Sequence, residues 1–307
     1  MKHVVSVSIG SSTRNHRVTE RFFGESFLIE RIGTDGKIDD AIALIRDMDG
    51  KVDAFGMGGI DLYIVNGDHR YTFRDARRIA SAAQKTPIVD GSGLKNTLER
   101  HVVAQMAEDP KLSPKGKRVL IVSAMDRFGM AEAMVAAGAH CTFGDLPFAI
   151  DVPMGLHSLK TLGLLSRIAL PIVTQLPFTL VYPTGTAQEQ ESVPRFQRFY
   201  EEAEIIAGDF HYIRKYLPAR IDGKTILTNT TTSRDVALLR ERGAACLITT
   251  TPQWEGRSFG TNVLEALLVA SVGQRPETID PQTYEEWILR LGITPHVERW
   301  DREAADA

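Results

Sequence analysis

The feature that most constrains this chain is a strand–turn–helix–strand pattern over residues 117–146. Residues 118–123 form a short apolar run, typical of a parallel strand that is buried on both faces. A polar turn at residues 124–129 leads into an Ala- and Met-rich helix at 130–137, with Gly138 placed as its C-cap. A second strand ends at Asp145. The pattern predicts that residues 119–122 lie inside a mostly parallel sheet.

The spacing inside this unit indicates a nucleotide site. Ser123 and Asp145 stand 22 residues apart, close to the ~20 residues that separate a phosphate-binding turn from an acid on the ribose hydroxyls. The turn has one glycine, Gly129, where the dinucleotide fingerprint has three, so backbone near Arg127 and Gly129 would hold a pyrophosphate in an unusual cradle. An acid at Asp145 would repel a 2′-phosphate, which favours NAD over NADP as the cofactor.

Residues 223–251 repeat the same order of Gly-Lys, strand, polar turn, helix, Gly-Ala and strand, with Ser233 expected as the helix N-cap. Further strands are expected at residues 171–182 and 204–208. Thr250 and Thr251 end the last strand of the repeat, where their hydroxyl groups could line a cofactor crevice. The alternative is that threonine is simply a good strand former. Alternating strands and helices favour parallel pairing through right-handed crossovers.

The first third of the chain has a different pattern. Strands are expected at residues 4–9, 27–32, 52–55 and 87–90, and helices at 38–48, 73–84 and 94–106. Asn66-Gly67 between two apolar runs predicts a tight hairpin. Residues 109–116 are polar and contain two prolines, which indicates a boundary. We expect an α/β fold with an N-terminal α/β substrate domain (1–112), a Rossmann-like parallel-sheet domain (113–276), and a C-terminal helix and tail (277–307).

Composition excludes several classes of protein. The chain has 307 residues and a net charge of −3, with a pI near 6.3, so electrostatics favours neither nucleic acid nor acidic membranes as partners. Cys141 and Cys246 both fall in predicted buried strands, and the histidines form no metal-binding pattern. We expect a cytoplasmic protein with a small-molecule substrate, no bound metal, and a homodimer as the candidate assembly.

A Gly-x-Gly turn at the start of a predicted helix supplies the first candidate site. Asp90-Gly-Ser-Gly93 follows a strand, and helix N-termini favour anions. Lys95 and Asp90 are the candidate catalytic groups there, with Lys95 as proton carrier, and Asn96 is a candidate substrate ligand. The alternative is an ordinary glycine-rich turn in which Asp90 caps the helix.

The end of the first strand supplies a second candidate site. Ser6 and Ser8 share one face of the strand because side chains repeat every second residue, and Arg14 follows in the next loop. This set suits a carboxylate or polyhydroxy ligand. The alternative is a solvated loop whose hydroxyl groups close local turns.

The chain resembles the shikimate and quinate dehydrogenases, and bacterial proteins labelled quinate 5-dehydrogenase. The best local match is the strand from Gly243 to Pro252, which is similar to that family's Asn-Ala/Thr-Thr-Pro run beside the nicotinamide. Ser6-Val-Ser8 is similar to the Ser-x-Ser that holds the substrate carboxylate in the family. The family's Asn-Val-Thr-x-Pro-x-Lys motif is absent, and Lys95 stands as a loose substitute for its lysine.

This resemblance implies an oxidoreductase that transfers a hydride between a nicotinamide cofactor and a cyclic polyol acid such as quinate. Lys95 would accept the proton, which requires its pKa to fall towards neutrality. Two alternatives come from other classes: a non-catalytic protein that binds a nucleotide or another small molecule, and a transferase that uses a nucleotide-linked donor.

Overall fold

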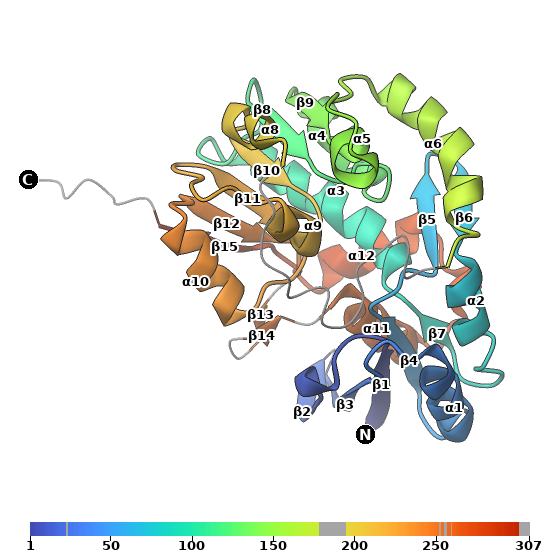
Figure 1. Cartoon of the computed structure of the whole chain (residues 1–307). Helices are drawn as coiled ribbons and strands as arrows, with labels where there is room; N and C mark the ends of the chain where they lie inside the picture. The colour runs from blue at the N-terminus through green and yellow to red at the C-terminus, as the bar shows by residue number, and fades with distance from the viewer. Residues whose placement is uncertain (23, 178–194, 252, 255–256, 259, 301–307) are drawn as a thin grey trace, which may run out of the picture. The chain divides into compact units, whose positions relative to one another are not determined.

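The computed structural model describes the chain except for residues 23, 178–194, 252, 255–256, 259 and 301–307 (Figure 1). The chain forms two compact units. The first unit comprises residues 1–97, 167–189 and 260–292, and the second comprises residues 98–166, 190–259 and 293–307. This division differs from the expected boundaries at residues 112 and 276, because residues 261–272 form a helix that packs on the sheet of the first unit.

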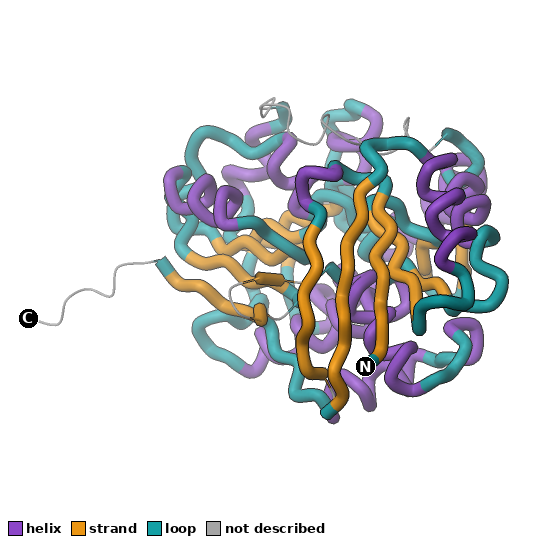
Figure 2. Tube along the Cα trace, turned by 90° about the horizontal axis from the view of Figure 1, so that it is seen from below, coloured by secondary structure: helices purple, strands orange, loops and turns teal. Residues whose placement is uncertain are grey.

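The first unit contains a five-stranded sheet with the order β2-β3-β1-β4-β7. Its strands are β1 (Lys2–Ser8), β2 (His16–Phe22), β3 (Glu25–Gly33), β4 (Ala54–Gly58) and β7 (Ile88–Val89). All neighbours are parallel except the edge strand β2, which was not expected from the sequence. Figure 2 shows the long strands side by side, with the N-terminus at the start of β1.

Helices cover both faces of this sheet. On one face, Val5, Val7, Phe55 and Met57 pack against α1 (Ile38–Met48) and α2 (Arg74–Ala80), whose apolar residues recur at helical spacing. On the other face lies α11 (Thr261–Val272). The unit also contains α12 (Pro281–Arg290), the 3-10 turns Ser12–Arg14 and Pro276–Thr278, and the expected hairpin of β5 (Tyr63–Asn66) and β6 (His69–Thr72).

The second unit contains a six-stranded sheet with the order β15-β12-β11-β10-β8-β9. Its strands are β8 (Arg118–Ile121), β9 (His140–Phe143), β10 (Ile205–Ala207), β11 (Thr225–Thr228), β12 (Cys246–Thr249) and β15 (His296–Arg299), of which only β15 is antiparallel to its neighbour. Residues 119–122 are at most 1% exposed, which confirms their interior position. The order reverses between β8 and β10, the topological switch point where open α/β sheets bind ligands.

Alternate residues of β8 point into two cores. Val119 and Ile121 face α3 (Ser92–Glu108) and α4 (Phe128–Ala136), whereas Leu120 and Val122 face the helices of the opposite side. The remaining helices are α5 (Asp145–Ile150), α6 (Leu159–Val173), α8 (Gln197–Glu202), α9 (Phe210–Lys215) and α10 (Ser233–Glu241), and a short ribbon pairs β13 (Gln253–Trp254) with β14 (Arg257–Ser258). No helix in the described part of the chain is long and apolar enough to cross a bilayer.

Three local expectations were wrong. The strand expected from residue 171 is helical up to residue 173, because Leu162, Ser166 and Leu170 are buried at a spacing of one helical turn; its residues 178–182 lie outside the described chain. The N-cap of α10 is Thr232, which forms a capping box, and not Ser233. Asp145 begins α5 and does not end a strand, because β9 stops at residue 143.

Candidate functional site

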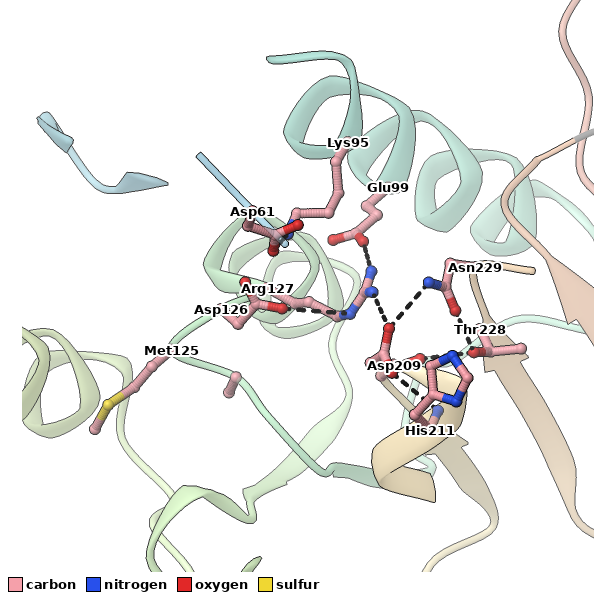
Figure 3. A network of polar contacts seen from close by, with 12 residues as sticks. Asp61, Lys95, Glu99, Met125, Asp126, Arg127, Asp209, His211, Thr228 and Asn229 are labelled. Carbon is pink, nitrogen blue, oxygen red and sulfur yellow. Dashed lines mark hydrogen bonds and ion pairs between the residues drawn. The ribbon is translucent and has the colours of Figure 1, made fainter. Parts of the chain in front are cut away.

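In the first unit, Lys95 is paired with an acid that the sequence did not single out. Lys95 lies in the first turn of α3, and its Nζ donates to Oδ2 of Asp61 over 2.9 Å (Figure 3). The lysine side chain is 11% exposed and that of Asp61 is 30% exposed. A charge-assisted hydrogen bond in such a sheltered place is stronger than one at the surface. Asn96, the next residue on α3, is half-buried.

Asp90 holds the two segments that carry this pair. Its carboxylate accepts the backbone N–H of Leu62 over 2.6 Å and that of Ser92 over 3.2 Å, and it also accepts the Ser92 hydroxyl. Leu62 directly follows Asp61, and Ser92 is the first residue of α3. Burial raises the pKa of Asp90, and the Ser92 hydroxyl and the Leu62 amide oppose that rise. Asp90 therefore bonds backbone amides and a neighbouring hydroxyl, whereas the sequence indicated a role for it in proton transfer.

The carboxyl end of β1 brings hydroxyl groups together with arginines. Ser8 Oγ accepts from Arg31 Nη2 and from the Gly10 amide, both over 3.1 Å, and Ser6 Oγ accepts from Asn262 Nδ2 over 2.9 Å. Burial, and then the charge of Arg14, lower the pKa of Arg31 to about 10. Two arginines of like charge at one strand end form a place that an anion would stabilise. Arg31 was missed because only the pairing of β3 with β1 brings it to Ser8.

In the second unit, polar groups meet at the switch point of the sheet. Arg127, at the N-cap position of α4, is 3% exposed and forms ion pairs with Glu99 and, over 3.2 Å, with Asp209 (Figure 3). Asp209 follows β10 and also accepts Asn229 Nδ2 over 3.0 Å. Buried charges persist only when they are paired, so this network fixes the β8 and β10 loops relative to each other. Glu99 could have been found from the sequence, because it lies on the apolar face of a helix and a buried glutamate usually has a charged partner.

The other predicted cofactor residues lie at the same end of this sheet. Thr251 Oγ1 donates to the carbonyl of Asn229 over 3.1 Å, and the Thr250 amide donates to the Thr228 carbonyl over 2.8 Å. Ser123 Oγ is buried and lacks a hydrogen-bond partner among the described residues. Gly129 is buried in the first turn of α4.

The turn after β8 is occupied by a carboxylate from its own chain. Asp145 accepts the backbone N–H of Ala124 over 3.2 Å and that of Met125 over 2.8 Å. The residue is 7% exposed, and burial raises its pKa to about 7 in spite of these hydrogen bonds. These two amides are the groups that a phosphate would use in a strand–turn–helix cradle. Asp145 thus holds the turn, whereas the sequence indicated that its carboxylate meets a ribose.

The chain belongs to the family described as Domain of unknown function (DUF8754), whose model matches residues 93–300, and residues 3–90 match a second model, Domain of unknown function (DUF8753). No curated protein matches the sequence. Membership of this family comes with no stated activity, so the chemistry has to come from the residues themselves.

Several solved structures are similar in fold at low identity. A sugar ABC transport substrate-binding protein from Bordetella parapertussis is 12% identical, with 90% of this chain and 82% of that chain covered and a TM-score of 0.39. An NAD-dependent malic enzyme from Thermotoga maritima is 13% identical, with coverages of 84% and 68% and a TM-score of 0.35. A malic enzyme from Entamoeba histolytica is 13% identical, with coverages of 96% and 64% and a TM-score of 0.42.

Proposed function

We propose that this protein is an oxidoreductase that transfers a hydride between a nicotinamide dinucleotide and a hydroxylated carboxylic acid of the quinate type. The observation that carries the proposal is the sheltered Lys95–Asp61 pair at the N-terminus of α3. An oxidation of this kind needs an acceptor for the hydroxyl proton, and a lysine with a carboxylate partner supplies one.

The pair explains how a lysine could act near neutral pH. A carboxylate beside a lysine favours the ammonium form, so Lys95 alone would be a poor base. In the proposed step, the substrate hydroxyl gives its proton to Nζ while Nζ passes a proton to Oδ2 of Asp61. The charge on the lysine is unchanged and Asp61 becomes protonated, so the pair acts as one acceptor.

The substrate carboxylate would bind at the carboxyl end of β1. Arg31 and Arg14 supply positive charge there, and Ser8 Oγ already bonds Arg31. A planar guanidinium suits bidentate binding of a carboxylate. Ser6 would act through Asn262, whose amide it accepts.

The dinucleotide would bind at the switch point of the second unit, where it would supply the hydride acceptor. The residues there fit such a group only in part: Ser123 has a buried hydroxyl that lacks a partner among the described residues, whereas the charge of Arg127 is already paired with Glu99 and Asp209. Thr250 and Thr251 lie at the same end of the sheet. Because Asp145 already bonds the turn amides, a pyrophosphate would depend on Ser123 more than on backbone. The preference for NAD over NADP stays a prediction from the sequence, because Asp145 bonds the turn amides and the ribose contact on which that preference depends has no support here.

The same Asp145 contact favours a second candidate. A turn whose amides are already satisfied suits a protein that binds a small polyhydroxy ligand without a dinucleotide. Calorimetric titration with NAD and NADP separates the two candidates directly: the oxidoreductase should bind NAD, and the second candidate should bind neither.

Turnover then tests the lysine. Reduced-nicotinamide absorbance should rise when NAD and a cyclic hydroxy acid are added, and Lys95→Ala should lower the rate by roughly 10²–10⁴-fold. Lys51 is also paired with an aspartate, but at an exposed position, so Lys51→Ala is the matched control. A Lys95→Ala variant that keeps full turnover would rule out the proposed acceptor.

A further inference from the structure

The sheet of the first unit has a topological switch point of its own, between β1 and β4. Along the chain, β1 is followed by β2 and β3, which lie on one side of it, whereas β4 is followed by β7, which lies on the other side. The loops that leave β1 and β4 therefore run in opposite directions, which is the topology at which open α/β sheets bind ligands beyond the carboxyl ends of their strands. Ser8 and Gly58, the last residues of the two strands, are register partners.

Arg31 reaches this point without a carboxylate partner. Its Nη2 donates to Ser8 Oγ over 3.1 Å and its Nη1 donates to the Ser11 carbonyl over 3.0 Å, and both acceptors are neutral. Arg31 is half-buried, yet no ion pair joins it to another described residue. The two other charges that act on it, those of Arg14 and Asp35, have opposite signs. One positive charge is left over, and a monovalent anion would compensate it, since sheltered charges are stable only when paired.

The turn after β4 offers two backbone donors beside Ser8. The amides of Gly59 and Ile60 have no hydrogen-bond acceptor among the described residues. Gly59 has a φ of +74°, and a Cβ there would lie 3.4 Å from Ser8 Oγ. The same Ser8 Oγ lies 3.1 Å from Arg31 Nη2. The turn and the guanidinium are therefore close enough for one carboxylate to contact both, and successive amides of a turn are a common anion-binding arrangement.

We propose that the Gly59–Ile60 turn and Arg31 bind one carboxylate group between them, with the two amides donating to one oxygen and the guanidinium to the other. The inference rests on the proposed function for the kind of ligand, a hydroxylated carboxylic acid, and adds the backbone of the turn to the side chains of that site. One uncompensated positive charge suits a monovalent carboxylate better than a divalent phosphate. The carboxylate would bind in this way whether or not a hydride is transferred.

Amide NMR spectra of the full chain test the proposal without any dinucleotide. Titration with quinate, and with acetate as the smallest carboxylate, should move the Gly59 and Ile60 amide resonances until they saturate. The neutral polyol myo-inositol should leave them in place. Arg31→Met should weaken quinate binding at least about tenfold, because the carboxylate loses a hydrogen bond from a charged group. Arg46→Met, at an exposed position on α1, is the control and should bind quinate as the wild type does.

Gly59→Ala provides a second variant. Its methyl group is strained at a positive φ and meets the Gly10 nitrogen at 3.1 Å, so the turn should move and quinate should bind at least about tenfold more weakly. Gly116→Ala is its control, because Gly116 has a φ of +73° with open space around it, and should bind quinate normally.

Three results would overturn the proposal: neither carboxylate moves the two amide resonances, myo-inositol moves them as much as quinate does, or inorganic phosphate at pH 8 displaces acetate at equal concentration. The proposed function can fail separately. If acetate moves the resonances but quinate does not bind, or if quinate binds as described and is not oxidised with NAD, the oxidoreductase is contradicted and the carboxylate site stays supported.

Discussion

Replacing Asp145 by asparagine should make the stability of this protein less dependent on pH. The carboxyl group is 7% exposed, and burial raises its pKa to about 7, although the Ala124 and Met125 amides bond to it. Asparagine has nearly the same shape but does not titrate. It also has one side-chain oxygen in place of two, so one of the two amides loses its partner.

The direction in which stability changes with pH follows from proton binding by the folded and unfolded states. The pKa of Asp145 in the folded chain, about 7, lies above the ordinary aspartate value of about 3.9. Between these values the folded state binds the proton more tightly than the unfolded state does. The stability from this proton is complete below about pH 4 and is lost as the pH rises through about 7.

The size of the stability change comes from the difference between the pKa values of Asp145 in the folded and unfolded states. Three pKa units correspond to roughly 4 kcal/mol in total, of which roughly 2–3 kcal/mol falls between pH 5 and pH 8. The lost amide hydrogen bond costs the variant about 1 kcal/mol at both values of pH, so it cancels in the comparison. Relative to the wild type, Asp145→Asn should therefore gain about 2 kcal/mol on going from pH 5 to pH 8.

Urea unfolding at the two values of pH measures this difference in the free energy of unfolding. Asp151→Asn removes a carboxyl from the C-terminal end of the same helix, where the side chain is 59% exposed, and serves as the control. If Asp145→Asn and the wild type lose stability in parallel between pH 5 and pH 8, then Asp145 is not a buried titrating group and the reasoning is refuted.

Three further predictions concern stability. Arg127→Met should cost about 3–5 kcal/mol in urea unfolding because it leaves Glu99 buried without this cation, and adding Glu99→Leu should recover part of that loss. Gly93→Ala should cost about 1–3 kcal/mol in the same assay, since the added methyl overlaps Glu265 and Tyr284. Thr232→Ala should lower the melting temperature through the loss of about 1 kcal/mol of N-capping, whereas Ser233→Ala should change it much less.

Elements with strong periodicity could be predicted from the sequence. The helix at residues 38–48 has the expected bounds, because its apolar residues recur at helical spacing and glycines flank its ends. The hairpin at Asn66-Gly67 also forms as expected. By contrast, α6 carries an apolar run that reads equally well as a strand, and only its contacts decide in favour of a helix.

The candidate site also contains residues that the sequence could predict and residues that it could not. Lys95 and Arg127 could be singled out because each lies at the start of a helix after a strand, but their partners could not. Asp61 lies 34 residues from Lys95, and Asp209 lies 82 residues from Arg127. A sequence gives the residue types at strand ends, whereas the pairing of those ends depends on strand order. The order of the second sheet becomes known only from the fold.

Both units place polar side chains at the carboxyl ends of parallel strands and then use some of them internally. Asp145 bonds the amides of its turn, and Asp90 bonds the loops that carry Lys95. Each carboxylate thus occupies donors that a bound anion would otherwise use, which holds the loops in place before any ligand arrives. The groups that these contacts leave for a ligand are Ser123 in the second unit, and Arg31 with Arg14 in the first.

A ligand that binds through these residues should leave the pKa of Asp145 near its value in the ligand-free protein, whereas a pyrophosphate that displaces Asp145 from its amides should change that pKa. Infrared titration of the carboxyl band distinguishes the two outcomes.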